Sequence, residues 1–244
     1  MCPSDQREVS YRTDGHVAYI TLDRPSRRNA LTYRCAVELE SALLRAKDDA
    51  HIRSIVLTGA GTAFCSGVDL DERQQERPEQ FRDFLDRLYN RLHHIHTNLG
   101  KPTIAAVNGP ARGAGCTMAF MCDMVIASES ASFGLPEVNV GMLPGYHLAF
   151  LPRTIGKHKA FEIALGAKPF SASDAERLGI VNAVLSDTNW DNEVYDFASQ
   201  FSQISPRAMQ VGKTAFYRVM DVEFSKAIAD GADAVVILSG SENT

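Results

Sequence analysis

The chain of 244 residues is long enough for one large folded domain, and its hydrophobic share of 45% and charged share of 23% are ordinary for a globular protein. The formal net charge of -5 argues against nucleic acid or an anionic membrane as the main partner. The 5 cysteines show no CxxC spacing, which favours reduced thiols in a cytoplasmic protein over a disulfide framework or a zinc site. No apolar run approaches the roughly 20 residues that a membrane-crossing helix needs, and the polar first residues do not resemble a signal peptide.

Short apolar runs alternate with amphipathic stretches through the first half of the chain. Residues 32–49 and 114–122 read as helices, and each lies between two apolar runs. The apolar runs read as buried strands at 17–22, 54–59, 103–109 and 123–128. Because strands and helices alternate, the pattern predicts an α/β fold with a parallel sheet whose crossover helices cover both faces.

A helical pattern lies between the expected strands at 54–59 and 103–109. In residues 79–96 apolar side chains recur at helical spacing. The stretch "DERQQERPEQ" (71–80) has many charges and no apolar periodicity, and it predicts a mobile surface loop. Ser173 precedes Glu176 at the spacing of a capping box, and Gly179 is the expected stop of that helix.

The last part of the chain reads as mostly helical. Further helices are expected at 191–203, 206–218 and 223–237. The predicted organisation is therefore an α/β core over residues 1–190, followed by a helical C-terminal region over residues 191–244.

Two junctions between a strand and the following loop are rich in small residues: "TGAGTAFCSGVDL" (58–70) and "NGPARGAGC" (108–116). Neither contains the dinucleotide fingerprint G-x-G-x-x-G, and "GKT" at 212–214 fails as a P-loop because Arg207 stands where that motif needs glycine. Loops at the carboxyl ends of parallel strands face the same side of the sheet, so one N–H group from each loop would meet at a carbonyl oxygen, as in an oxyanion hole. The alternative is that these glycines only permit tight turns.

Four segments in order resemble successive signatures of the crotonase superfamily, the enoyl-CoA hydratase/isomerase family, and the resemblance as a whole runs over residues 10–220. They are "GTAFCSGVDL", "KPTIAAVNGPARGAGC", "MCDMVIASESASFGLPEVNVGMLPG" and "SASDAERLGIVNAV". The resemblance implies a crotonase (ClpP/crotonase-like) spiral of ββα units with a helical C-terminal trimerisation region. It also implies acyl-CoA thioesters as substrates, a homotrimer or dimer of trimers, and no metal or redox cofactor.

The resemblance also assigns roles to residues. Val68 and Ala114 would supply the two oxyanion-hole N–H groups, and Glu137 would be the catalytic carboxylate. The alternative for Glu137 is a solvated or salt-bridged loop carboxylate. Coenzyme A contacts are expected from the loop "RPSRRNAL" and from the segment around position 68. The alternative for the arginines of that loop is a surface cluster that binds no ligand. The expected contact residues are Arg24, Arg27, Ser66, Asp69 and Leu70.

Two departures from the family pattern bear on the reaction. Hydratases of the family carry a second carboxylate at the position of Thr117, and a threonine hydroxyl cannot replace it in acid–base work. Glu137 without that partner favours a Δ3,Δ2-enoyl-CoA isomerase, in which one base moves a proton between C2 and C4. The second departure is "PGYHLAFLP", where the family commonly reads "PGAGGTQRL". It brings Tyr146 and His147 near the acyl pocket, as part of its wall or, for His147, as a second proton-transfer group.

Other interpretations stay open. A hydratase, C–C lyase, decarboxylase or thioester hydrolase would use Tyr146 or His147. A non-catalytic acyl-CoA-binding protein is suggested by the missing acid at position 117 and by the C-terminus "AVVILSGSENT", which lacks the family's basic segment. The histidines of "LHHIHTN" (92–98) have no carboxylate or cysteine at ligand spacing and predict a solvated helix end, with no metal site.

Overall fold

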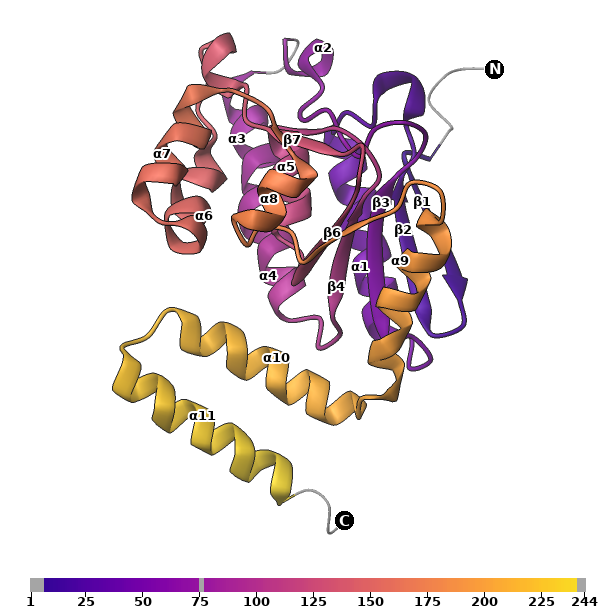
Figure 1. Cartoon of the computed structure of the whole chain (residues 1–244), viewed down its shortest axis with the longest axis vertical. Coiled ribbons are helices and arrows are strands. Elements are labelled where there is room, and N and C mark those ends of the chain that lie inside the picture. Colours follow the sequence, from indigo (N-terminus) through magenta and orange to yellow (C-terminus); the bar gives the residue numbers. More distant parts are fainter. Residues whose placement is uncertain (1–6, 75–76, 241–244) are drawn as a thin grey trace.

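The structure of the chain, a computed structural model, describes residues 7–74 and 77–240. Within these residues the main sheet has six strands in the order β1-β2-β3-β4-β6-β9 (Figure 1). They are β1 (Val9–Asp14), β2 (Val17–Leu22), β3 (Ser54–Gly59), β4 (Thr103–Val107), β6 (Met124–Ser128) and β9 (Ala183–Leu185). β1 pairs with β2 in antiparallel fashion, and all the other pairs are parallel. The predicted parallel α/β sheet is confirmed.

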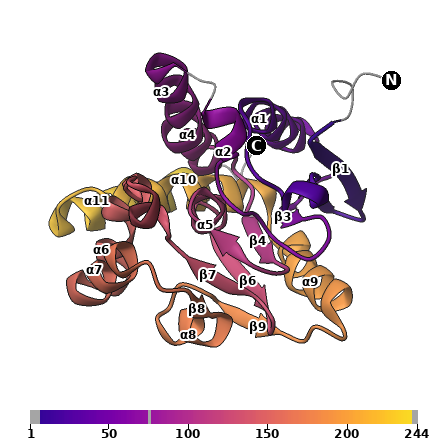
Figure 2. The same ribbon diagram turned by 90° about the horizontal axis from the view of Figure 1, so that it is seen from above.

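Helices cover both faces of this sheet (Figure 2). Successive residues of β2 belong to different clusters: Ala18 and Ile20 face the side of α1 (Tyr33–Asp48) and α5 (Ala114–Phe120), while Val17 and Tyr19 face α9 (Trp190–Ser199). The side chains of the central strands are therefore buried on both sides, which is why the parallel strands read as unbroken apolar runs. β1 has mostly exposed residues after Val9, and its polar sequence gave no such signal.

A smaller three-stranded sheet and two isolated bridges join the loops that follow β3 and β4 to neighbouring segments. The sheet consists of β5 (Ala111–Arg112), β7 (Ser132–Gly134) and β8 (Phe170–Ser171), in the order β5-β7-β8. Isolated parallel bridges join Cys65 to Ala111 and Leu31 to Val68. The loop after β3 is thus bonded to the segment after β4, and the helix α5 begins at this junction.

The helical prediction for residues 79–96 is confirmed. The segment consists of α3 (Pro78–Asp86), a π-helical turn η3 (Arg87–Arg91) and α4 (Leu92–Thr97), and its apolar spacing buries Phe84, Leu88 and Leu92. The expectation of a solvated end is wrong for His96, which is 1% exposed and lies 3.4 Å from the Thr103 hydroxyl.

The predicted loop over residues 71–80 is only partly correct. A short helix, α2 (Leu70–Arg73), begins inside it, because the Asp69 side chain accepts hydrogen bonds from the N–H groups of Asp71 and Glu72. Pro78 then starts α3 at a position that proline favours. Residues 75 and 76 of the predicted loop lie outside the described residues.

The second half of the chain is largely helical, as predicted. After the turn η4 (Glu137–Val140) come α6 (Gly145–Ile155), α7 (Lys157–Gly166) and α8 (Ala172–Arg177). The predicted capping box is displaced by two residues: Ser171 caps α8 and Asp174 completes the box, because β8 ends at Ser171 and the helix starts directly after it. Gly179 follows the helix in the left-handed conformation, as a stop signal should.

Two long helices close the chain. α10 (Pro206–Met220) and α11 (Phe224–Ser239) follow α9 and the turn η5 (Gln200–Gln203), and they form a pair that stands apart from the sheet (Figure 1). Lys213 anchors α10 to the core, since its ammonium group donates to the Asp123 carboxylate at 2.6 Å. Among the described residues, no helix has the length and apolar character needed to span a membrane.

Candidate active site

Two backbone N–H groups without partners lie where the loops after β3 and β4 meet. Arg112 N–H donates to the Cys65 carbonyl at 2.9 Å, so the loops run side by side. A Cβ atom built on Gly67 would lie 3.6 Å from the nitrogen of Ala114. Within the described part of the chain, no hydrogen-bond acceptor faces the N–H of Val68 or of Ala114. The two loops that the sequence analysis expected at one side of the sheet do lie side by side, and the role of their N–H groups stays a prediction.

Small residues are required at the start of α5. Gly113 precedes the helix with φ of +52°, and a Cβ atom there would lie 3.1 Å from Oε1 of Glu137. At Gly115 a Cβ atom would lie 2.3 Å from the Cys65 carbonyl oxygen, so no larger residue fits. The glycines therefore let the helix terminus approach both the neighbouring loop and a carboxylate.

Glu137 brings its carboxylate to this helix terminus. The residue begins η4, and its carbonyl accepts from Met142 N–H at 2.9 Å. Its Oε2 atom is buried and has no hydrogen-bond partner among the described residues. Burial raises the pKa of the Glu137 carboxyl, and no charged neighbour among the described residues contributes to that shift. An acid that holds its proton to higher pH than usual is suited to proton transfer near neutrality.

Thr117 and His147 face each other on neighbouring helices. The Thr117 hydroxyl on α5 lies 3.1 Å from Nε2 of His147 on α6, and the two residues are 2% and 1% exposed. Burial lowers the pKa of the His147 imidazole to about 4, so the ring is neutral at pH 7. Its Nδ1 atom has no hydrogen-bond partner among the described residues. Thr117 was named from the sequence as the position of the missing carboxylate, and His147 was expected near the acyl pocket, but their hydrogen bond was not predicted.

Aromatic rings pack beside this pair. Tyr146 is half-buried, stacks on Phe150 at 5.8 Å and lies 6.0 Å from the ring of Tyr89. Burial raises the pKa of the Tyr146 phenol to about 12. Tyr89 was missed by the sequence analysis; it stands on the π-helical turn, and burial and the Glu137 charge both raise its pKa. Single-turn π-helices are frequent at functional sites, but the sequence carries no signal for this one.

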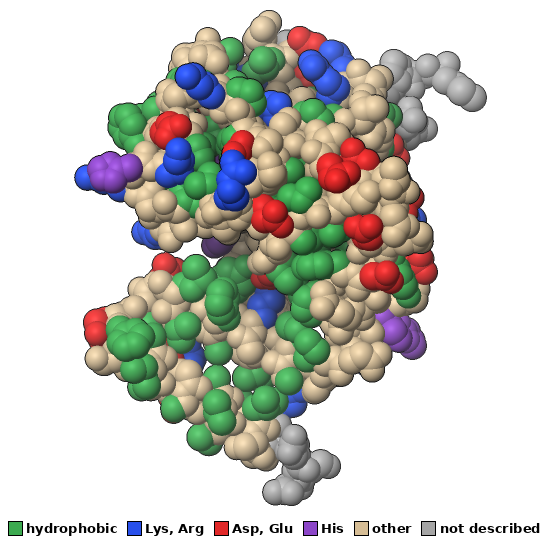
Figure 3. Space-filling model, viewed as in Figure 1, with side chains coloured by type: hydrophobic (Ala, Val, Ile, Leu, Met, Phe, Trp, Pro, Cys, Tyr) green, Lys and Arg blue, Asp and Glu red, His purple; other side chains and the backbone are tan. Residues whose placement is uncertain are grey.

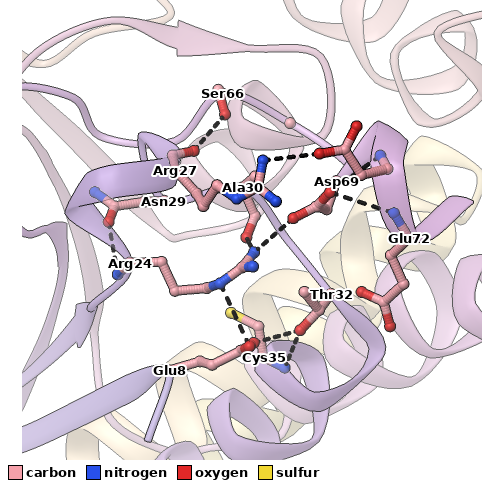
Figure 4. Close-up of polar contacts among 12 residues, drawn as sticks. Glu8, Arg24, Arg27, Asn29, Ala30, Thr32, Cys35, Ser66, Asp69 and Glu72 are labelled. Atoms are coloured by element: carbon pink, nitrogen blue, oxygen red, sulfur yellow. Dashed lines mark hydrogen bonds and ion pairs between the residues drawn. The ribbon is translucent and has the colours of Figure 1, made fainter. Parts of the chain in front are cut away.

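Arg24, one of the two arginines expected to reach coenzyme A, is already paired (Figure 4). The Arg24 guanidinium lies 3.3 Å from the Glu8 carboxylate and 3.0 Å from that of Asp69, and it donates to the Ala30 carbonyl. Its side chain is 18% exposed. Asp69 in turn caps α2, and the Arg24 hydrogen bond helps to lower the pKa of its carboxyl against the effect of burial. These contacts connect the residue before β1, the loop after β2 and the start of α2.

The other residues expected near coenzyme A are more accessible. Arg27 pairs with Asp71 at 2.8 Å, and its side chain is 56% exposed. Ser66 donates to the Arg27 carbonyl, and Leu70 is 50% exposed. Within the described residues no cluster of three or more histidine, cysteine or acidic side chains has a metal-binding arrangement.

Comparison with known proteins decides the family. A model of the family described as Enoyl-CoA hydratase/isomerase matches residues 12–237. The chain belongs to this family. Similar curated members are a 2,3-dehydroadipyl-CoA hydratase of Escherichia coli, 34% identical over 93% of this chain and 88% of that protein, and a short-chain-enoyl-CoA hydratase of Clostridium acetobutylicum, 34% identical over 93% of this chain and 87% of that protein.

Solved structures of family members agree with this fold. An enoyl-CoA hydratase of Polaromonas superposes with a TM-score of 0.91 at 31% identity, covering 96% of this chain and 93% of that one. An enoyl-CoA hydratase of Bacillus anthracis gives 0.90 at 31% identity, with coverages of 97% and 92%. The crotonase fold inferred from the sequence resemblance is confirmed, and the chain is an enzyme of the enoyl-CoA hydratase/isomerase family.

Proposed function

We propose that this chain is a Δ3,Δ2-enoyl-CoA isomerase in which Glu137 is the proton carrier. The observation that carries the proposal is the contrast between Glu137 and position 117. The Glu137 carboxylate lies at the helix terminus with one oxygen unpartnered among the described residues, whereas position 117 holds a hydroxyl that already bonds to His147. Hydration needs a second group to handle water, and isomerisation needs one base that takes a proton and returns it.

The proposed reaction uses the backbone for charge and the carboxylate for the proton. The thioester oxygen accepts hydrogen bonds from the N–H groups of Val68 and Ala114, which stabilise the enolate that forms when Glu137 removes a proton from C2. The C3=C4 double bond then shifts to C2=C3, and Glu137 returns the proton to C4. Atoms and charge balance in this reaction without water, metal or redox cofactor.

Hydration of a 2-enoyl-CoA is the second candidate. It is favoured by the names of the similar proteins, which are hydratases in Escherichia coli and Clostridium acetobutylicum. In this chain a hydratase would have to use the Thr117 and His147 pair in place of a second carboxylate, with a neutral imidazole near the attacking water.

One assay separates the two candidates. Purified protein is given 3-enoyl-CoA and 2-enoyl-CoA of several chain lengths, and the products are identified by mass spectrometry and NMR. We expect 2-enoyl-CoA from the first substrate, with little 3-hydroxyacyl-CoA from the second. Rapid formation of 3-hydroxyacyl-CoA without isomerisation would overturn the isomerase proposal in favour of hydration.

We also propose that coenzyme A is held near Arg27, Ser66 and Leu70, and that the chain assembles into a homotrimer or a dimer of trimers in the cytoplasm. The oligomer proposal is supported by apolar side chains that α11 leaves exposed (Figure 3). Phe224 is 76% exposed, and Val235 and Val236 are each 67% exposed. Sedimentation equilibrium of the purified protein tests this: a monomer at micromolar concentration would contradict it.

A further inference from the structure

We propose that the hydrogen bond between Thr117 and His147, called here the Thr117–His147 bridge, positions Glu137 relative to the oxyanion-hole N–H of Ala114. Thr117 lies one helical turn after Ala114 on α5, and its N–H donates to the Gly113 carbonyl at 3.2 Å. His147 lies on α6, which follows the turn that carries Glu137. The inference rests on the proposed proton transfer by Glu137.

The bridge is one of the polar links between these two segments. Another is the hydrogen bond from Gly113 N–H, just before α5, to the Gly134 carbonyl, three residues before Glu137, at 2.9 Å. Residues 135–155 are all described, and apart from His147 their hydrogen bonds stay within the stretch itself. Met142 N–H closes the turn on the Glu137 carbonyl, and His147 N–H closes the next one on the Pro144 carbonyl, each at 2.9 Å. The segment from Glu137 to α6 is therefore bonded internally, fixed to the start of α5 just before Glu137 through Gly134, and tied to α5 after Glu137 through the His147 ring.

The surroundings of the bridge suit a fixed geometry. The Phe120 and Tyr146 rings both pack edge-on against the His147 ring, each with centroids 5.6 Å apart. The imidazole and the hydroxyl are both almost fully buried, so water does not compete for their hydrogen bond. The isomerisation proposed above needs one proton carrier, so within it the role of this pair is to hold the Glu137 carboxylate in place.

Loss of the bridge should slow proton transfer without weakening substrate binding. A carboxylate displaced by even about 1 Å from its reacting carbon loses a large part of its rate advantage. Thr117→Val keeps the size of the side chain and removes the hydrogen bond, whereas Thr117→Ser keeps the hydroxyl. We expect Thr117→Val to lower kcat by about 10- to 100-fold with KM nearly unchanged, and Thr117→Ser to stay close to wild type.

A matched control and a double variant complete the test. Thr103→Val removes another buried threonine hydroxyl, at the start of β4, which donates to the Asp123 carboxylate at 2.9 Å. This variant should lose stability in urea unfolding but keep its kcat. In a double-mutant cycle, Thr117→Val combined with His147→Leu should be no slower than the slower single variant, because both remove one interaction.

The outcomes are distinct. A wild type that does not isomerise 3-enoyl-CoA would overturn the proposed function and, with it, the bridge's role. A wild type that isomerises, together with a folded Thr117→Val variant of unchanged kcat, would overturn only the inference about the bridge. Additive losses in the double variant, or a loss in Thr103→Val equal to that in Thr117→Val, would do the same.

Discussion

Two buried polar clusters in this chain differ in how completely their hydrogen bonds are made. Where α10 packs on the core, the Asp123 carboxylate accepts four hydrogen bonds. They come from the backbone and hydroxyl of Thr103 at 2.6 and 2.9 Å, from Lys213 at 2.6 Å and from Tyr217 at 2.7 Å. At the start of α5, the Glu137 carboxylate has an oxygen without a partner among the described residues. Both clusters join a helix to the segment beside it.

The difference separates a structural role from a chemical one. A buried polar group without a partner costs free energy, and a fold keeps such groups where something else compensates. Near α5 they include Oε2 of Glu137 and Nδ1 of His147, and the N–H groups of Val68 and Ala114 also have no acceptor within the described residues. The charged groups around Asp123 bind one another and so hold α10 against the core. Near α5, the N–H groups of Val68 and Ala114 and the Glu137 carboxylate remain available to a substrate.

The largest expected effect is the loss of turnover when Glu137 loses its charge. Glu137→Gln should lower kcat for 3-enoyl-CoA isomerisation by about 10²- to 10⁴-fold, the usual contribution of a general base. Its free energy of unfolding should not fall, because burial already disfavours the carboxylate, as its raised pKa indicates. Steady-state kinetics and urea unfolding measure the two quantities. Turnover that survives the substitution would remove Glu137 from the reaction.

The opposite pattern is expected in the other cluster. Lys213→Met should lower the free energy of unfolding by about 2–3 kcal/mol, because it leaves the Asp123 carboxylate, which is 17% exposed, without its cation. The Lys213 side chain is 4% exposed. Lys226, which pairs with Asp230 and is 61% exposed, offers the control. Lys226→Met should cost no more than about 1 kcal/mol. Equal losses in the two variants would contradict the distinction between the clusters.

The smallest expected effect is the change in the free energy of unfolding with pH that two buried histidines cause. Burial lowers the pKa of His147 to about 4 and that of His96 to about 3. The unfolded chain binds protons at these rings below its ordinary pKa of about 6.5, and the folded chain does not, so stability should fall as the pH drops from about 6.5 towards 4. The slope is at most about 1.4 kcal/mol per pH unit for each ring.

Urea unfolding at about pH 7, 6 and 5 checks this slope. His147→Gln should flatten the pH dependence, because one of the two rings no longer takes up a proton on unfolding. A slope that is unchanged in the variant would show that His147 is not held neutral in the folded chain.

The sequence predicts the parallel core well because burial on both faces leaves an unmistakable apolar run, as in β2, β3, β4 and β6. It fails where contacts come from distant segments. The burial of His96 depends on α4 packing against α1 and α10, and α8 starts where β8 ends, at Ser171. Local spacing cannot predict either feature.

The candidate site follows the same rule. Val68, Ala114 and Glu137 are predicted from motifs, since the small residues and the acid stand in recognisable order. The pairing of Arg24 with Glu8 and Asp69 joins residues far apart in the chain and was not predicted. The Thr117–His147 bridge likewise forms between two helices, and the local sequence around either residue carries no signal for the contact.

The central claim is that backbone N–H groups hold the thioester oxygen while Glu137 moves the proton. Ala114→Pro tests it most directly, because Ala114 is the first residue of α5, where proline is tolerated, and the substitution removes the N–H. The account predicts a kcat about 10²- to 10³-fold lower in a variant that unfolds at nearly the wild-type urea concentration. A kcat within about twofold of wild type would contradict it.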